Sequence, residues 1–585
     1  MDRHLFLRWA LITALLVTYT QLFVPHMRTQ LTQQEAKVQP VPSVPTITTE
    51  VEAKEAYGIF ANALGGKEQE VVLENELIKV ILTSRGARVK RVMLKKYKDH
   101  EQNILTLLDE KSSLMGLQFQ KAGEPIDVHA LCFKHITVLK DPKAKDAQTT
   151  VIFTLPIAKG RYIQQRFTLK KHNYTLTHTW KVVGLSELLD TTSGRLIWKN
   201  LVKRTETDLE ACRNRTTVNF YTEARKFGHL NERAVKAVHK YLTKPMRWVS
   251  IKQRFFTVGI VPSKAFSKGV ATTIPTPEST STVKAAEVYL SLDNFSTSNG
   301  HEGECTLYFG PNDHTTMCKV AEGFSRNVTL GWSVVRFTNR FMILPIFSLL
   351  ERYISNYGII IVLLVLFIKL MLFPLSYRSY HAMAKMRLLQ PALETIRKKH
   401  GNNLKRLQME QLKLYQEMKL NPLSGFVPLL LQMPILLAMF TFFPNTIALR
   451  QQAFLWAHDL STYDAVLKLP FSLPAYGNHV SLFTLLMTVS TLLYTWSSNQ
   501  ANAPQGAMKM LTYIMPLMLL CILNRFPAGL TFYYFVSNVT TFIQQYYIRQ
   551  FVDEQAITKQ WEQSSFNKPS TIKKRLAKIA RVTKQ

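Results

Sequence analysis

The type and position of Lys369 most strongly suggest a functional site. Residues 358–375 form an apolar run, and Lys369 carries a charge within it. A run of that length approaches a bilayer span. Polar sequence resumes seven residues later at Ser376, so at about 1.5 Å per helical residue the lysine would lie roughly 10 Å inside the membrane. A charge at that depth costs about 2.5–3.5 kcal/mol. The ammonium is therefore expected to face a water-filled site or, alternatively, to snorkel toward the headgroups.

The last apolar segment, residues 526–548, is unusual because it carries many polar side chains. They are Tyr533, Tyr534, Ser537, Asn538, Gln544 and Gln545. An earlier apolar segment, residues 423–443, has no charged residue but contains Gln432 between two prolines. A helix that faced only lipid would not carry so many polar groups, so the last segment is predicted to face more than lipid.

The composition limits the classes of function. The 585-residue chain is long enough for a sizeable soluble domain plus several spans, and its net charge of +33 predicts polyanionic partners such as anionic lipid, nucleic acid or acidic protein. Its five cysteines match no metal-site spacing, and the chain has no phosphate-binding glycine-lysine loop, no HExxH and no dinucleotide fingerprint. We therefore expect no metal, no cofactor and no ATP hydrolysis.

The first 56 residues are predicted to anchor and tether the rest. In residues 1–25 the basic residues Arg3 and Arg8 precede an apolar run that lacks a good cleavage site, which favours an uncleaved signal anchor with its N-terminus inside. Residues 26–56 are rich in Pro, Gln, Thr and Val, a composition typical of an extended tether.

Residues 57–330 are predicted to form a large all-β sandwich. Short alternating runs rich in β-branched and aromatic residues recur from residue 76 to residue 292, separated by turn signals. The histidines of this region, which include His129, His135, His172 and His178, are not clustered in sequence, so a catalytic set is disfavoured. If the domain is extracytoplasmic, Cys305 and Cys318 could pair, but the sequence leaves the disulfide pattern of Cys132, Cys212, Cys305 and Cys318 open.

The remainder alternates apolar and basic segments. Residues 331–354 are amphipathic and contain Pro345, which favours an interfacial helix. Residues 355–375 are predicted to form the second transmembrane helix. Residues 376–420 hold ten Lys/Arg against three Glu and have apolar residues at helical spacing on both sides of residues 400–403, which predicts a basic helical hairpin with a break or kink at Pro391. Residues 421–548 are predicted to contain transmembrane helices 3 to 6, and residues 549–585 to form a basic tail. Six spans place the hairpin and the tail on the same cytoplasmic side, as the positive-inside rule requires.

From residue 355 onward the sequence resembles the YidC/Oxa/Alb family of membrane-protein insertases. The matching residues are Asn356-Tyr357-Gly358, Phe373-Pro374-Leu375, residues 384–391 (AKMRLLQP), residues 421–425 (NPLSG), residues 428–435 (PLLLQMPI), residues 526–530 (FPAGL) and residues 533–538 (YYFVSN). The sandwich resembles the Gram-negative type of this family more weakly, through Trp248, Phe255-Phe256 and residues 307–311 (LYFGP). Members commonly have arginine where this chain has Lys369, so the charge is kept but the planar multi-donor group is not.

The resemblance implies a polytopic α-helical protein of the bacterial inner membrane, with about six transmembrane helices and a large extracytoplasmic sandwich in the periplasm. It implies an insertase and chaperone that works alone or with the Sec translocon on nascent membrane proteins. A hydrophilic groove would be formed by Lys369, Gln432, Asn538, Gln545, Tyr533 and Tyr534, and clients would slide along Met433, Pro434, Met518, Leu519 and Leu520 into lipid. The hairpin, with Lys385, Arg387 and Pro391, would receive clients or touch targeting factors. No bond is made or broken in such a step, so no enzyme is expected.

Several alternatives stay open at this point. The basic tail is expected to bind ribosomal RNA or, instead, anionic lipid headgroups. A transporter that binds an anionic solute at Lys369 is a second reading, although it should show broken helices or repeated halves, and no internal repeat is evident. A membrane-anchored carbohydrate enzyme centred on the sandwich is a third, but it needs paired carboxylates or a histidine set and leaves the polar last span unexplained.

Overall fold

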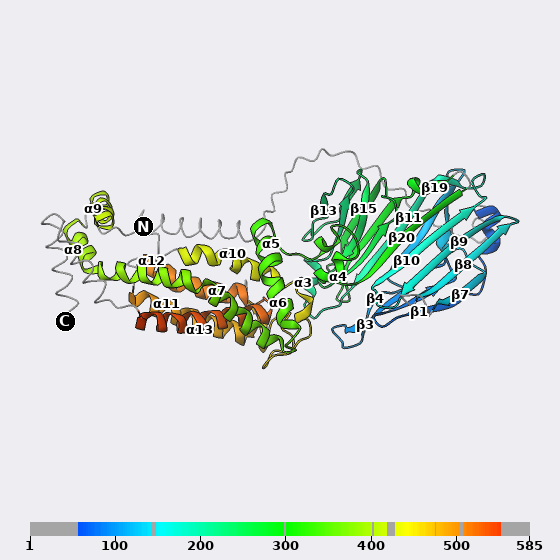
Figure 1. The fold of residues 1–585 in the computed structure, drawn as a ribbon. Coiled ribbons are helices and arrows are strands. Elements are labelled where there is room, and N and C mark those ends of the chain that lie inside the picture. The colour runs from blue at the N-terminus through cyan, green and yellow to red at the C-terminus, as the bar shows by residue number, and fades with distance from the viewer. Residues whose placement is uncertain are drawn as a thin grey trace.

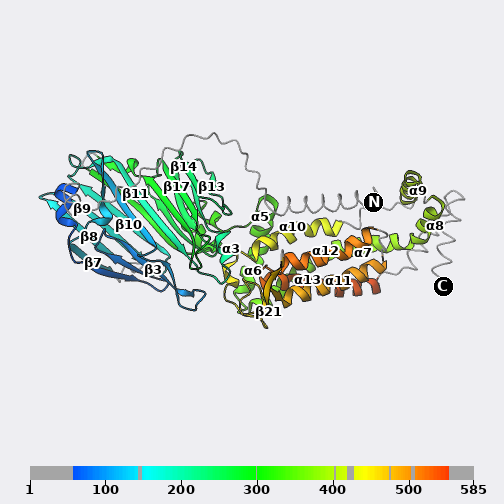
Figure 2. The same ribbon diagram turned by 180° about the vertical axis from the view of Figure 1, so that it is seen from behind.

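The computed structural model describes residues 57–141, 148–297, 300–400, 403–417, 427–473, 476–501 and 507–551. These residues form two parts that lie end to end, a β-sandwich and a helical bundle (Figure 1; Figure 2 from behind). The predicted signal anchor, the tether and residues 552–585 of the predicted tail lie outside the described residues.

The predicted sandwich is confirmed, and it consists of three antiparallel sheets. The four-stranded sheet has the order β1 (Glu70–Glu74), β2 (Ile78–Thr83), β3 (Arg88–Lys98), β4 (Ile104–Leu108). The six-stranded sheet has the order β14 (Val238–Leu242), β17 (Gly269–Pro275), β18 (Thr282–Ser291), β11 (Asp190–Lys203), β5 (Ser113–Lys121), β6 (Glu124–Asp127). The ten-stranded sheet has the order β13 (Phe227–His229), β12 (Thr217–Thr222), β15 (Met246–Lys252), β16 (Phe256–Pro262), β20 (Gly300–Pro311), β10 (Thr175–Val183), β9 (Arg161–Lys170), β8 (Gln148–Ala158), β7 (His135–Asp141), with β19 (Ser296–Thr297) beside β20.

The core lies between the sheets because the strands alternate buried and exposed side chains. In β10 every second residue from Leu176 to Val182 is buried, the period expected of a strand with one face in a core. Across the interface the ring of Phe119 in β5 contacts that of His301 in β20, with centroids 5.2 Å apart. Short helices fill the connections: η1 (Gly58–Ala63), η2 (Val128–Ala130), α3 (Leu209–Arg213), η3 (Asp293–Phe295), α4 (His314–Cys318) and η4 (Phe324–Asn327).

The buried histidine of β10 predicts that the sandwich loses stability in acid. His178 stacks on Phe167 with centroids 4.4 Å apart, and its Nε2 lies 2.9 Å from the Gln165 side-chain oxygen. Burial lowers the pKa of His178 from 6.5 to about 3. Below pH 6.5 the unfolded chain therefore binds a proton that the folded chain does not, so folding stability is full above that pH and falls as the pH drops toward 3.

We expect this residue to account for a loss of about 1.4 kcal/mol of unfolding free energy per pH unit in that window. Urea titrations followed by tryptophan fluorescence at several pH values measure it, and His178→Gln should reduce the slope. The matched control is His172→Gln, since His172 is solvent-exposed. A His178→Gln protein with the parent pH dependence would contradict the assignment.

The helical part contains one long helix and several shorter ones. Its elements are α5 (Ser333–Thr338), the π-helix η5 (Asn339–Ile343), α6 (Leu344–Glu351), α7 (Tyr357–Leu388), α8 (Gln390–His400), α9 (Leu404–Glu417), α10 (Val427–Phe442), η7 (Ile447–Leu449), α11 (Leu482–Ala501), α12 (Ala507–Leu523) and α13 (Ala528–Phe551). A two-stranded hairpin of β21 (Ala465–Leu473) and β22 (Gly477–Ser481) precedes α11.

Helix α7 is longer than the sequence predicted. The second transmembrane helix was expected to end at residue 375, but α7 passes through Pro374 and ends at Leu388, so the first arm of the predicted hairpin is divided between the end of α7 and α8. Pro391 is the second residue of α8. Proline lacks an amide donor and is tolerated in the first turn of a helix, which explains why the chain breaks just before it.

Two helical stretches, 333–351 and 357–378, are long and apolar enough to cross a membrane among the described residues. Shorter apolar helices cover Gln432–Phe442, Leu482–Trp496 and Tyr513–Leu523. Helices α5 and α6 run across the end of the bundle nearest the sandwich, whereas α7, α11 and α13 run along it (Figures 1 and 2).

Arginines that are buried (Arg254, Arg450) or half-buried (Arg215) join the sandwich to the loop between α10 and α11. Arg450 Nε lies 2.9 Å from both carboxylate oxygens of Glu206, and these side chains are only 2% and 3% exposed. Arg254 donates to the carbonyl oxygen of Ser461 at 2.6 Å, and Arg215 donates to that of Pro444 at 2.6 Å. Burial lowers the pKa of Arg215 to about 9. Keeping this guanidinium charged in the interface therefore costs the free energy of its lost hydration.

The cysteines of the sandwich are not bonded to one another. Cys132, Cys212 and Cys305 are buried free thiols, and Cys318 is exposed. The pairing of Cys305 with Cys318 considered from the sequence is therefore absent here. Cys305 lies in β20 and faces the core, where burial raises the pKa of its thiol, while Cys318 ends α4 at the surface.

Candidate functional site

Lys369 points from α7 toward α13. Its ammonium donates a hydrogen bond to Thr541 Oγ1 at 2.7 Å, and the residue is only 9% exposed. The Thr541 hydroxyl in turn donates to the carbonyl oxygen of Ser537 at 2.7 Å, one turn earlier in α13. The threonine oxygen is thus oriented by its own helix to accept from the lysine. The side chain is directed at a neighbouring helix and not along α7 toward its end.

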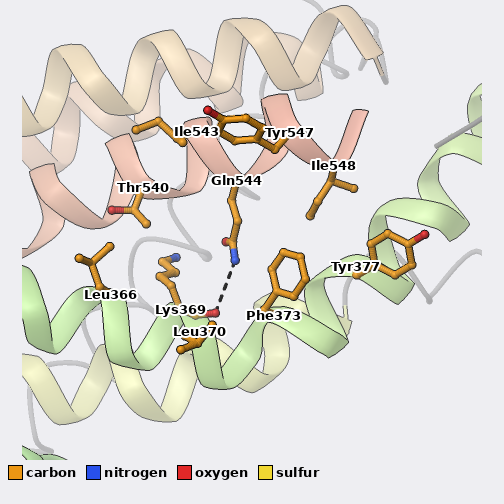
Figure 3. A pocket seen from close by; sticks show the side chains of 10 residues that line it. All are labelled: Leu366, Lys369, Leu370, Phe373, Tyr377, Thr540, Ile543, Gln544, Tyr547 and Ile548. Carbon is orange, nitrogen blue, oxygen red and sulfur yellow. Dashed lines mark hydrogen bonds between the residues drawn. The ribbon is translucent and has the colours of Figure 1, made fainter. Parts of the chain in front are cut away.

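A cavity of about 680 Å³ opens beside this contact, between α7 and α13. Figure 3 shows the side chains that line it: Leu366, Lys369, Leu370, Phe373, Tyr377, Thr540, Ile543, Gln544, Tyr547 and Ile548. None of these residues is acidic, and most are apolar. Leu370 and Tyr547 are largely exposed, so the cavity opens on the surface of the bundle.

The two helices present these residues by ordinary helical spacing. On α7, residues 366, 369, 370, 373 and 377 recur at three and four residues and so share one face, while Leu364, Val365 and Ile368 are buried in the bundle core. On α13, residues 540, 543, 544, 547 and 548 do the same. Gln544 Nε2 donates to the Lys369 carbonyl oxygen at 3.4 Å, which ties the two faces together.

This arrangement offers one cation and a few hydrogen-bonding groups in a mainly apolar recess. The ammonium has three donors, of which one is used by Thr541, so it can bind a carboxylate or a carbonyl oxygen that enters the cavity. No group of three or more His, Cys, Asp or Glu able to hold a metal ion occurs among the described residues. The geometry thus offers one buried cation to a polar or acidic group that enters the cavity.

Of the polar residues singled out in the sequence, Gln544 lines this cavity with Lys369, whereas the others do not. Asn538 faces α11, where its amide donates to Thr491 Oγ1 at 2.8 Å and to Ser490 Oγ at 3.1 Å. Tyr533 is buried against Phe443, with ring centroids 5.6 Å apart, in the core of the bundle.

Tyr534 packs against the ring of Phe440 in α10, with centroids 5.7 Å apart. Gln545 is buried on α13, and Gln432 is half-buried on α10. The polar residues of α13 therefore contact two neighbouring helices. The face that carries Thr541 and Gln544 meets α7, and Asn538 meets α11.

The residues of the expected client path lie on two other helices. Met433 and Pro434 are half-buried on α10, and Met518, Leu519 and Leu520 are half-buried on α12. Lys385 and Arg387 belong to the last turns of α7, and Pro391 to the first turn of α8.

Sequence reasoning missed the direct partner of Lys369. Thr541 carries no signal by residue type, since a helical threonine usually bonds its own backbone, as it does here. The spacing of Ser537, Thr541 and Gln544 along one face of α13 was the available signal, and Gln544 was noted only as one of many polar residues. Phe373 was noted only as part of a family motif, and Tyr377 and Tyr547 resemble ordinary helix residues and gave no signal.

Comparison with known proteins follows the same two-part division. The family described as "60Kd inner membrane protein" matches residues 349–555, and the family described as "YidC periplasmic domain" matches residues 70–349. The membrane protein insertase YidC of Amoebophilus asiaticus is 46% identical over 98% of both chains. That of Cytophaga hutchinsonii is 39% identical over 96% of this chain and 93% of its own. A solved structure described as "Active YidC insertase crystal structure with the first transmembrane domain resolved" is 16% identical, covers 85% of this chain and 97% of that one, and has a TM-score of 0.34.

Proposed function

This chain belongs to the YidC family of membrane protein insertases, and from that premise we propose that the cavity beside Lys369 receives the polar end of a client segment on its way from the cytoplasm into the membrane. The observation that carries the proposal is the buried ammonium of Lys369, which lies between two apolar helices, bonds to Thr541 and borders a cavity of about 680 Å³. An acidic or polar client end would rest there against Lys369 and Gln544.

The energetic role of the cavity is to lower a desolvation barrier. A polar segment that crosses hydrocarbon loses its hydration, which costs several kcal/mol per charged or unsatisfied group. A cation and hydrogen-bonding groups part-way through the membrane replace some of that hydration. The apolar part of the client then leaves into lipid, and its burial at about 25 cal/mol per Å² supplies the drive without a nucleotide. We assign this exit to the path along Met433, Pro434 and Met518–Leu520.

We also propose six spans in the bacterial inner membrane, with the sandwich in the periplasm. The N-terminal segment 1–25 would be the first span, and α7, α10, α11, α12 and α13 the others. Helices α5 and α6 would lie at the interface, which their crosswise direction and their charges support (Figure 1). This topology places the basic segments 376–420 and 549–585 in the cytoplasm.

The partners we propose are nascent membrane proteins, the Sec translocon, ribosomes and anionic lipids. The cytoplasmic segment 376–420 carries ten Lys/Arg against three Glu and would meet incoming clients first. We propose that the protein also assists the folding of the clients that it releases. A transporter function finds no specific support in the geometry, because the cavity opens on the side of the bundle.

Reconstitution of the purified chain in nucleotide-free liposomes tests the proposal. The client is a small single-span protein with an acidic N-terminal tail, and protease protection reports its insertion. We expect insertion above the level of empty liposomes. Correctly folded protein that gives no insertion would contradict an autonomous insertase and would favour a translocon-dependent chaperone.

The basic tail gives a separate prediction. Residues 549–585 hold nine Lys/Arg against three acids, so full-length protein should cosediment with ribosomes in a manner that weakens steeply with salt. Deletion of residues 565–585 should weaken the binding and flatten its salt dependence. The same two proteins are compared on vesicles that contain anionic lipid. Unchanged ribosome binding together with lost vesicle binding would assign the tail to lipid headgroups instead.

A further inference from the structure

Strand β21 exposes large apolar side chains that no described part of the chain covers. Val466, Leu467 and Phe471 are 58%, 58% and 57% exposed, and Leu473 is also exposed. The hairpin has only two strands, so β21 is an edge strand with one side unpaired. An exposed apolar edge strand in water is an aggregation hazard that proteins normally avoid.

Hydrogen bonds nevertheless hold strand β22 of the hairpin to the helical bundle. Asn524, at the turn between α12 and α13, accepts from the Ser481 amide at 3.0 Å and donates to the His479 carbonyl at 2.7 Å. The His479 ring stacks on Tyr463 with centroids 3.8 Å apart and bonds to the Asn524 carbonyl at 2.8 Å.

Asp464 joins the hairpin to the start of α11. Its carboxylate accepts from the Phe483 amide and the Trp456 indole, at 2.9 and 2.8 Å, and from the Ser481 hydroxyl. Ser481 accepts in turn from the Thr484 amide and so caps α11. A strand anchored by so many satisfied polar groups holds its apolar residues in a defined place.

The hairpin lies at the end of the bundle nearest the sandwich, where Figure 2 labels β21. Ser481 ends β22 and α11 begins at Leu482, so the hairpin stands directly on the end of an apolar helix. Phe337 in α5 and Phe341 in η5 are also exposed, and their ring centroids lie 4.9 Å apart. The exposed apolar side chains of β21 and of α5 and η5 thus lie at the same end of the bundle, the end nearest the sandwich.

We propose that the hairpin of β21 and β22 inserts the exposed apolar residues of β21 into the outer leaflet of the bilayer, as a lipid anchor separate from the spans. The sequence of the strand argues against another β-strand as the occupant. Lys468 lies in the middle of β21 and Pro470 lacks an amide donor, and both features prevent edge-to-edge pairing. Lys468 is exposed and can reach the phosphates of the headgroups while its neighbours enter the acyl region. The anchor goes beyond the proposed function, because it does not involve the Lys369 cavity.

Depth-dependent fluorescence quenching in the full chain tests the anchor. The accessible thiols Cys318 and Cys521 are first replaced by serine, and an environment-sensitive fluorophore is attached at Phe471→Cys. The protein is reconstituted in vesicles of phosphatidylethanolamine and phosphatidylglycerol, with or without lipids that carry a doxyl quencher near the headgroup. Leu493→Cys, exposed on α11, serves as the lipid reference, and Val235→Cys, exposed on the sandwich, as the water reference.

We expect the label at position 471 to emit at short wavelength, to lose most of its emission to the doxyl lipid as the label at 493 does, and to resist aqueous iodide. The label at 235 should show the opposite pattern. A label at 471 that behaves like that at 235 would overturn the proposal. A blue-shifted label at 471 that is protected from iodide but not quenched by doxyl lipid would also overturn it, since a protein surface would then cover the strand.

Discussion

Lys369→Ala should reduce insertion of a client with an acidic N-terminal tail by about 100-fold, and Lys369→Glu should reduce it further. The lysine provides the positive charge of the cavity lining, and placing or removing a charge at this depth is worth about 2.5–3.5 kcal/mol. Lys369→Arg should retain insertion, because the charge remains. Initial rates of protease protection in liposomes that contain each variant measure these differences.

The direction of the effect should reverse with the charge of the client. A client whose tail carries lysines in place of its acids should insert better through Lys369→Glu than through the parent chain. Ile359→Ala is the matched control, since Ile359 is exposed near the other end of α7 and does not line the cavity. Full activity of Lys369→Glu with the acidic client would rule out an electrostatic role for this residue.

Arg450→Ala should open the joint between the sandwich and the helical part. The substitution leaves the Glu206 carboxylate, which is 3% exposed, without its cation. Removing one partner of a buried ion pair costs about 3–5 kcal/mol. Amide hydrogen exchange at residues 204–208 and 447–452 should therefore accelerate by roughly two to four orders of magnitude. Glu206→Ala should have an effect of similar size, because it leaves Arg450 unpaired.

The chain offers an ion pair of the same length on its surface as a control. Arg161 and Glu187 also lie 2.9 Å apart, but their side chains are 38% and 76% exposed. Because exposed pairs are worth at most about 1 kcal/mol, Arg161→Ala should accelerate local exchange by about fivefold or less. Equal effects of Arg450→Ala and Arg161→Ala would show that the buried pair does not hold the two parts together.

The sequence was informative where patterns are local. Alternation of buried and exposed residues in segments such as β10 predicted the sandwich, and the apolar run around Lys369 predicted α7. A basic helical hairpin was also predicted, but its first helix boundary was misplaced, because Pro374 is accommodated within α7 while Pro391 coincides with a helix start. Proline alone does not distinguish these two situations in a sequence.

Contacts between distant residues could not be predicted. Lys369 and Thr541 are 172 residues apart, and only the packing of α7 on α13 brings them together. The polar residues of α13 were expected to act as one set, whereas helical geometry divides them between faces, with Thr541 toward α7 and Asn538 toward α11. The sandwich–bundle joint is equally nonlocal, since Glu206 and Arg450 are separated by 244 residues.

The most direct test of the central claim is site-specific photocrosslinking from two consecutive tyrosines. Tyr546 and Tyr547 are 58% and 56% exposed on α13, but only Tyr547 lines the cavity. Each is replaced in turn by a photoreactive phenylalanine analogue, and a ribosome-bound client with an acidic tail is offered. We predict crosslinks to the client tail from position 547 that greatly exceed those from position 546 and that are lost in Lys369→Glu. Equal crosslinking from the two positions, or crosslinking from 546 alone, would contradict client binding in the Lys369 cavity.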